Sequence, residues 1–255
     1  MYAFTYEAPG TTADAAALAA QGGQYLAGGQ SLLPSMRLRL ARPEQIVDLN
    51  RVQGLAGVAV NGQTVEIRAM TRHADVAANP QVQAAIPALA ELAGGIGDRQ
   101  VRARGTIGGS LANNDPAACY PSAVLGLGAT VVTDRREIAA DDFFQGMYTT
   151  ALGSGELITA VRFPVPKKAA YLKFKQPASR FALVGVFVAQ TDSGVRVAIT
   201  GAGLSVFRHA GLEAALNQSF TPDAAAQVLI DHADLNSDLH ALSLIHISEP
   251  TRLGM

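Results

Sequence analysis

The chain has 255 residues, of which 49 % are hydrophobic, so it can bury one large core or two smaller ones. Its 20 lysine and arginine residues balance 21 acidic residues, which leaves no net positive charge to attract a nucleic acid backbone. No apolar run of about 18 residues could span a membrane, no secretion signal begins the chain, and one cysteine with five scattered histidines forms no dense metal site, so we expect a cytoplasmic protein.

Short β-type runs alternate with helical stretches along the first half, and this alternation predicts a mixed α and β protein. The dipeptide Asn61–Gly62 supplies positive φ angles, so it predicts the tight turn of a hairpin. In chain order we expect a strand at 24–27, a helix at 31–40, a strand at 46–49, a hairpin of 56–60 and 64–69, helices at 71–78 and 85–93, and a strand at 129–133.

The character of the chain changes at 163–168, where two prolines and two lysines predict a linker or domain boundary. Beyond it, 182–190 and 195–200 form an expected antiparallel pair around a turn at 192–194. Helices are expected at 209–216 and 222–232. The second half is therefore predicted to be a compact, strand-rich unit with helices on one side.

The first of two glycine-rich passages is Ala27–Gly28–Gly29–Gln30–Ser31. Without side chains at the glycines, backbone N–H groups can approach a ligand closely, and Ser31 can cap the helix that follows. The positive end of that helix would favour a phosphate anion. Taken alone, the passage fits a strand-to-helix turn without a ligand equally well.

The second passage, 105–110, again places paired glycines beside hydroxyls, here Thr106 and Ser110, and polar residues at 113–115 follow it. Two such loops, about 80 residues apart, could hold one elongated pyrophosphate-containing molecule from two sides. Neither loop has the spacing of a Rossmann or P-loop nucleotide site, so those folds are not predicted.

These residues also resemble a known family. The segment 27–34 resembles the first FAD loop of the medium subunits of aerobic carbon monoxide dehydrogenases and their xanthine dehydrogenase relatives, and 96–110 resembles the second loop. The similarity includes 46–49, 155–158 and 171–174. It implies an α+β fold with a two-lobed FAD-binding domain of the vanillyl-alcohol-oxidase (PCMH) type at 1–166 and a small α+β C-terminal flavoprotein domain at 167–241. The tail at 242–255 does not resemble the family, so we expect a disrupted gene end and a truncated last domain.

The resemblance also implies which residues bind FAD. Asp115, Leu157 and Lys173 are candidates for the flavin ring or the adenine end, with Lys175 as an alternative to Lys173. Cys119 stands where similar subunits often carry an aspartate ahead of Tyr120–Pro121, so this contact is expected to be altered. The pyrophosphate and ribityl region would be held by Ala27, Gly28, Gly29, Gln30, Ser31, Leu32, Thr106, Ile107, Gly108, Gly109 and Ser110.

Other chemically suggestive residues have a simpler interpretation. His73 is expected to be structural at a helix start, Asp141–Asp142 to begin a helix, and Cys119 to be a small buried residue. The basic run Arg99, Arg102 and Arg104 is expected to have a surface or structural role. No nucleophile, base and orienting group occur together, so no catalytic residue is assigned.

The function implied by the resemblance is electron transfer by an oxidoreductase subunit of a molybdenum hydroxylase complex. The substrate would be oxidised on a large molybdopterin subunit, and electrons would pass through a small iron–sulfur subunit to FAD and then to quinone, NAD or oxygen. The expected assembly is a heterotrimer or its dimer. Two alternatives remain, a stand-alone flavin oxidase of the vanillyl-alcohol class and a ligand-binding module without redox activity.

Overall fold

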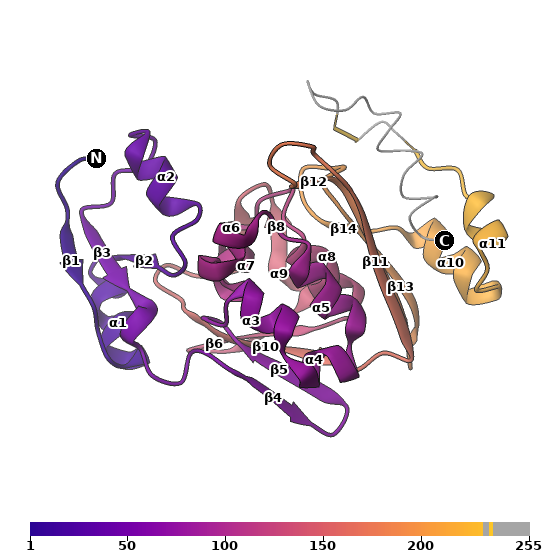
Figure 1. Ribbon diagram of the computed structural model, residues 1–255, viewed down its shortest axis with the longest axis horizontal. Coiled ribbons are helices and arrows are strands. Elements are labelled where there is room, and N and C mark those ends of the chain that lie inside the picture. Colours follow the sequence, from indigo (N-terminus) through magenta and orange to yellow (C-terminus); the bar gives the residue numbers. More distant parts are fainter. Residues whose placement is uncertain (232–234, 237–255) are drawn as a thin grey trace.

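The computed structural model describes residues 1–231 together with 235 and 236, and the expected atypical tail at 242–255 lies outside them. Three units follow one another along its long axis in chain order (Figure 1). A small N-terminal lobe is followed by a central lobe built on a five-stranded sheet, and a four-stranded sheet with its own helices closes the other end. None of the helices in the described part of the chain is long and apolar enough to cross a membrane.

The N-terminal lobe is a three-stranded parallel sheet in the order β1-β3-β2. Its first helix is capped by Thr11, whose hydroxyl oxygen accepts a hydrogen bond from the Asp14 N–H (3.1 Å). Ala15, Val47 and Leu49 form part of its small core. The elements are β1 (Thr5–Glu7), α1 (Thr12–Ala20), β2 (Gln24–Leu26), α2 (Leu32–Arg37), β3 (Gln45–Asp48) and a 3-10 turn (Leu49–Arg51).

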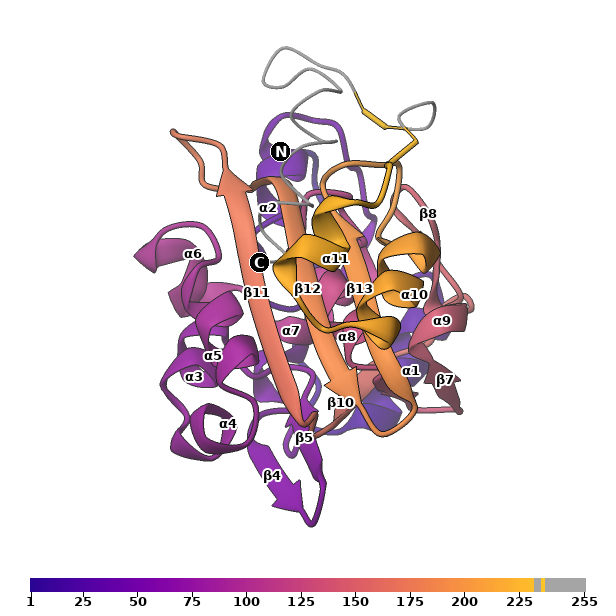
Figure 2. The same ribbon diagram turned by 90° about the vertical axis from the view of Figure 1, so that its right-hand side faces the viewer.

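The central lobe contains an antiparallel sheet in the order β4-β5-β10-β6-β7. Short helices cover the face that is turned toward the C-terminal sheet (Figures 1 and 2). The strands are β4 (Val58–Asn61), β5 (Thr64–Arg68), β6 (Thr130–Thr133), β7 (Glu137–Ala139) and β10 (Ile158–Pro164), with a separate pair β8 (Phe144–Gly146) and β9 (Thr149–Thr150). The helices are α3 (His73–Ala78), α4 (Pro80–Ala85), α5 (Pro87–Gly94), α6 (Arg99–Arg104), α7 (Ile107–Asn113), α8 (Tyr120–Gly126) and α9 (Ala140–Phe143).

The C-terminal unit is an antiparallel sheet in the order β11-β12-β13-β14. Its strand β12 is buried on both faces, which explains its nearly continuous apolar sequence. Phe187 and Ala189 face the central helices, while Val184, Val186 and Val188 face the outer helices. The elements are β11 (Lys168–Lys175), β12 (Ala182–Thr191), β13 (Gly194–Thr200), β14 (Phe207–Arg208), α10 (Ala210–Gln218) and α11 (Pro222–Ala226).

The main hydrophobic core is continuous across the expected boundary at 163–168. Val131 and Phe163 from the first side share it with Phe187 and Ala198 from the second. The connection between β10 and β11 contains Pro166, as the two prolines indicated, but the elements on its two sides pack against each other. The division into domains at this residue therefore stays a prediction.

Several expected elements are present with different bounds. The predicted helix 31–40 is the shorter α2, and the predicted helix 222–232 ends at Ala226. The hairpin turn lies one residue later than expected, because Asn61 pairs with Thr64 and only Gly62 has a positive φ (58°). The short helices of the central lobe were largely missed, since six or seven residues with no apolar period give a weak signal.

Candidate functional site

A large cavity lies between the N-terminal lobe and the central lobe. Its volume is about 1170 Å³, and its lining comes from both glycine-rich loops and from segments as distant as β11. Pockets for drug-sized molecules usually measure roughly 300–1,000 Å³. The cavity is therefore large enough for an elongated, dinucleotide-sized ligand.

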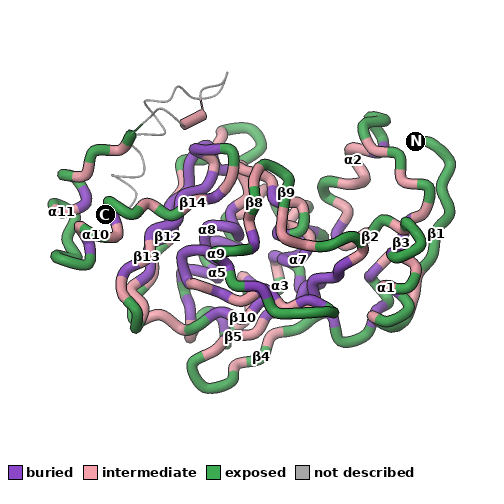
Figure 3. The backbone as a smooth tube through the Cα atoms, turned by 180° about the vertical axis from the view of Figure 1, so that it is seen from behind, coloured by how far each residue is buried: buried purple, intermediate pink, exposed green. Residues whose placement is uncertain are grey.

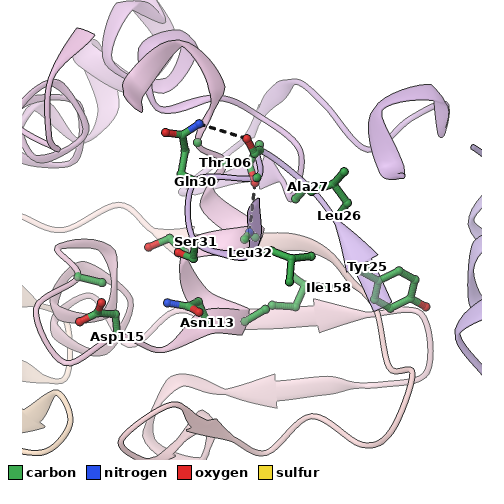
Figure 4. Close-up of a pocket in the computed structure, with 18 of the residues that line it drawn as sticks. Tyr25, Leu26, Ala27, Gln30, Ser31, Leu32, Thr106, Asn113, Asp115 and Ile158 are labelled. Carbon is green, nitrogen blue, oxygen red and sulfur yellow. Dashed lines mark hydrogen bonds between the residues drawn. The ribbon is translucent and has the colours of Figure 1, made fainter. Parts of the chain in front are cut away.

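Nearly all of the residues expected to bind FAD meet at this cavity. Ile107 is the exception, because its side chain is completely buried in the main core and does not line the cavity. Figure 4 shows several of the polar members, among them Gln30, Ser31, Thr106 and Asp115. The lining includes Ala27, Gly28, Gly29, Gln30, Ser31, Leu32, Thr106, Gly108, Gly109, Ser110, Asp115, Cys119, Leu157 and Lys173.

The first loop, 27–31, connects β2 to α2 and presents its backbone to the cavity. The left-handed φ of Gly29 (73°) turns the chain there without steric cost. Within the described part of the chain, the N–H groups of 28–32 donate no hydrogen bond, and Ser31 makes no side-chain capping bond to α2. Five consecutive amides without an acceptor in the protein, in a loop that lines the cavity, are available to an anion such as a pyrophosphate. The expectation that Ser31 caps α2 is therefore wrong, and the cap is left open.

The second loop, 105–110, is fixed by hydrogen bonds to the rest of the protein. The N–H groups of Ile107 and Gly108 donate to the carbonyl oxygens of Thr71 (3.2 Å) and Ala69 (2.8 Å). Thr106 caps α7, because its hydroxyl accepts the Gly109 N–H (3.2 Å) and its carbonyl accepts the Ser110 N–H (3.0 Å). This loop lies at the cavity with the amides of 107–110 already satisfied.

The two loops touch each other through their backbones. A Cβ atom at Gly28 would collide with the carbonyl oxygen of Arg104 and lie 2.8 Å from the Gly105 Cα atom. A Cβ atom at Gly109 would lie 3.4 Å from Ala27 on the first loop. The glycines thus allow one loop to rest on the other. The resulting cradle of free amides over a packed backbone fits the pyrophosphate of FAD.

Lys173 holds together one wall of the cavity. Its ammonium donates to the carbonyl oxygens of Gly95 (2.7 Å) and Arg180 (2.8 Å) and lies 3.4 Å from the Cys119 sulfur. Cys119 itself is 4 % exposed, so the expectation of a small buried residue is confirmed. Of the two lysines left open by the sequence, Lys173 lines the cavity, whereas Lys175 is exposed and is not part of the lining.

Sequence reasoning missed two side chains that shape the cavity. The Tyr25 hydroxyl donates to the Gly155 carbonyl oxygen (2.9 Å), and burial raises the pKa of Tyr25 to about 12. Glu156 is buried, and hydrogen bonding from Arg136 lowers the pKa of its carboxyl to about 2. The same carboxylate accepts the Gly153 N–H (2.7 Å), which fixes the loop at the cavity wall. In the sequence, the charge of Glu156 beside apolar neighbours in 155–158 was the signal that could have indicated its buried role.

Other residues singled out in the sequence have structural roles. His73 begins α3 as expected, is buried, and donates its backbone N–H to the Gly105 carbonyl oxygen (2.9 Å). Arg102 donates to the carbonyl oxygens of Ile96 and Gly97. Asp141 lies in the first turn of α9, as predicted, and pairs with Arg196 (2.7 Å).

Of the three polar residues that follow the second loop, only two reach the cavity. Asn113 and Asp115 belong to its lining, while Asn114 is 1 % exposed and has a left-handed φ of 43°. The Asn114 amide donates to the Gly146 and Thr149 carbonyl oxygens, so it anchors a neighbouring loop. The described residues contain no cluster of three or more His, Cys, Asp or Glu side chains placed to hold a metal ion.

Comparison with known proteins gives a consistent result. The model of the FAD-binding domain in molybdopterin dehydrogenases matches residues 2–166. The carbon monoxide dehydrogenase medium chain of Hydrogenophaga pseudoflava is 39 % identical over 87 % of this chain and 83 % of its own length. The nicotine 6-hydroxylase medium subunit of Paenarthrobacter nicotinovorans is 35 % identical over 97 % of this chain and 89 % of its own.

Solved structures agree with the sequence comparisons. The structure of carbon monoxide dehydrogenase from Hydrogenophaga pseudoflava, in a form that lacks the Mo-pyranopterin moiety, superposes with a TM-score of 0.89 at 35 % identity. The match covers 99 % of this chain and 95 % of that chain. The expected two-lobed FAD-binding fold followed by a small α+β unit is thereby confirmed. The chain belongs to the molybdopterin dehydrogenase family as one of its FAD-binding medium subunits.

Proposed function

We propose that this chain binds FAD in the cavity between its two lobes and passes electrons from an iron–sulfur subunit to an external acceptor. The observation that carries the proposal is the row of free N–H groups at 28–32, held against the second loop at the cavity wall. Bound FAD would supply the redox chemistry that connects single-electron carriers with a two-electron acceptor.

The chain's own residues would divide the work of binding. The amides of 28–32 would bind the pyrophosphate, and Thr106 would hold the second loop in the position that supports them. We propose that Asp115 and Leu157 lie along the remainder of the cofactor, as does the part of the cavity wall that contains Lys173. Cys119 offers a thiol there in place of a charged acceptor.

The proposed partners are a small iron–sulfur subunit and a large molybdopterin subunit, in a heterotrimer or its dimer. The relatives carry names with different substrates, carbon monoxide and nicotine, although their medium subunits are similar to this chain. We therefore place substrate choice in the large subunit. The cytoplasm is the proposed compartment, where the unpaired thiol of Cys119 would stay reduced.

An absorption spectrum of the purified chain before and after addition of FAD tests the proposal. We expect a bound-flavin spectrum, and anaerobic addition of the reduced iron–sulfur subunit should then bleach it. A flavin that alcohols reduce without partners would favour the stand-alone oxidase instead. A flavin that is bound but never reduced by the iron–sulfur subunit would favour the binding module.

A further inference from the structure

The N-terminal lobe exposes an unusual number of large apolar side chains. Leu38 and Leu40, which follow α2, are 71 % and 80 % exposed. Figure 3 shows much of this lobe coloured as exposed, in contrast with the core of the central lobe. Of the thirteen large hydrophobic side chains that the described residues expose, six lie in the first 40 positions: Met1, Tyr2, Phe4, Tyr6, Leu38 and Leu40.

Arginines connect the two segments that carry these side chains. The guanidinium groups of Arg39 and Arg42 lie over the Tyr2 ring, at 5.7 and 4.9 Å from its centroid. We call the surface formed by Tyr2, Leu38, Arg39, Leu40 and Arg42 the N-terminal patch. The N-terminal segment that contains Tyr2 and the segment 38–42 are therefore neighbours in space, and both are exposed.

The patch carries uncompensated positive charge. Neither Arg39 nor Arg42 forms a salt bridge with any described residue, and the sequence contains no acidic residue between Asp14 and Glu44. Exposed apolar groups surrounded by arginine and tyrosine are typical of protein interfaces. A complementary surface would have to offer carboxylates around an apolar centre.

The patch also has a fixed shape and a defined place. Arg39 has a left-handed φ of 62°, and the turn is closed by hydrogen bonds from the Leu40 and Ala41 N–H groups to the Ser35 carbonyl oxygen (2.8 and 3.3 Å). This turn follows directly on α2, whose first residue ends the row of free amides at the cavity. A partner bound to the patch would thus lie beside the loop that lines the cavity.

We infer that the N-terminal patch is the docking surface for an acidic, partly apolar face of the iron–sulfur subunit. The inference rests on the proposed function, because that function requires an electron donor close to the cofactor. A second copy of this chain and an anionic membrane surface are the other occupants that such a patch could attract.

The test uses the full chain in the double variant Arg39→Glu with Arg42→Glu, and separately Leu38→Ser with Leu40→Ser. Each is titrated with the purified, cluster-loaded iron–sulfur subunit of the complex. We expect each double variant to bind at least about tenfold more weakly than the wild type, with an unchanged flavin spectrum. As matched controls, Lys168→Glu reverses an exposed charge and Leu204→Ser removes an exposed leucine elsewhere, and both should bind normally.

The possible outcomes separate the inference from the proposed function. If the wild type binds neither FAD nor the iron–sulfur subunit, the proposed function fails. If the wild type binds both and the patch variants bind the subunit equally well, the docking inference alone is overturned. It is also overturned if the variants abolish only self-association, or only binding to vesicles of phosphatidylglycerol and phosphatidylcholine, and leave the complex intact.

Discussion

The first glycine-rich loop leaves the N–H groups of 28–32 free at the cavity, whereas the second donates those of 107–110 to its own surroundings. In the sequence the two passages look equivalent, with paired glycines beside hydroxyl side chains. In the structure the glycines of the second loop serve close packing, because Gly108 lies against Ala69. The first loop therefore keeps its amides available to a ligand, whereas the second loop is fixed to the protein and packs against the first.

The largest effect is expected from Gly28→Val, at the contact between the loops. The new side chain would collide with the Arg104 carbonyl oxygen and push the free amides away from the cavity. We expect FAD affinity to fall at least about 100-fold, or about 3 kcal/mol, in a flavin fluorescence titration. Gly10→Val is the matched control, because no atom lies within 4 Å of the corresponding Cβ position. Equal affinity of the two variants would show that the loops need not touch.

The stability of the protein should depend on pH through His73, whose ring packs against Gly105 of the second loop. Burial lowers the pKa of His73 from its ordinary value of 6.5 to about 4. Between pH 6.5 and 4, His73 is protonated in the unfolded chain but stays neutral in the folded protein. The free energy of unfolding therefore falls as the pH drops through this range. The contribution is of the order of 3 kcal/mol at the lower end.

Chemical denaturation across this pH range checks the role of His73. In His73→Asn, the loss of stability between pH 6.5 and 4 should be shallower than in the wild type. Glu156, whose pKa is lowered to about 2, begins to lose its stabilising effect only near the lower end of this range, and it does so equally in both proteins, so the difference between the two profiles reports His73. Identical pH profiles for the two proteins would rule out a neutral, buried His73.

A more moderate loss is expected from Gly108→Ala, which tests the second loop as a scaffold. The added methyl group would lie 2.6 Å from the Ala69 Cβ atom and 2.9 Å from its carbonyl oxygen. Overpacking of this kind costs about 1–3 kcal/mol, so thermal unfolding should occur at a lower temperature. Gly94→Ala should be neutral or slightly stabilising, since its new methyl group meets only Ala77 at 3.7 Å. A Gly108→Ala protein as stable as Gly94→Ala would contradict tight packing beneath the loop.

The smallest effect concerns the cap of α7. Thr106→Val removes the hydroxyl that accepts the Gly109 N–H, and this should reduce stability by about 1 kcal/mol. Thr11→Val removes a comparable cap from α1, away from the second loop. Both variants should lose similar stability in urea unfolding, but only Thr106→Val should also weaken FAD binding. If both weaken it alike, the effect is one of general stability.

Much of the cavity could be predicted from the sequence, because glycine pairs and the resemblance both point to particular positions. Leu157 and Lys173 line the cavity although they lie far from the glycine loops in the chain, and Asp115, which closely follows the second loop, lines it as well. The choice of Lys173 over Lys175 could not be made from spacing, because residues two apart on a regular strand point to the same face. The strand pairing is irregular between Phe174 and Lys175, and the sequence gives no local signal for that irregularity.

The different roles of the two loops were also beyond the sequence. Whether an amide is free depends on a carbonyl elsewhere in the chain, and the acceptors at Ala69 and Thr71 have no local signal near Gly108. The short helices escaped prediction for a similar reason, because packing between the two sheets stabilises them more than their own propensity does. By contrast, β12 was predicted almost in full, since burial on both faces leaves a continuous apolar run.

Amide hydrogen exchange, measured by NMR with and without FAD, distinguishes the two loops residue by residue. We expect the amides of 28–32 to exchange quickly in the free protein and to become protected when FAD binds. The amides of 107–110 should be protected in both states, because they already donate hydrogen bonds within the chain. Protection that appears only in the second loop, or FAD binding that leaves 28–32 in fast exchange, would contradict the account.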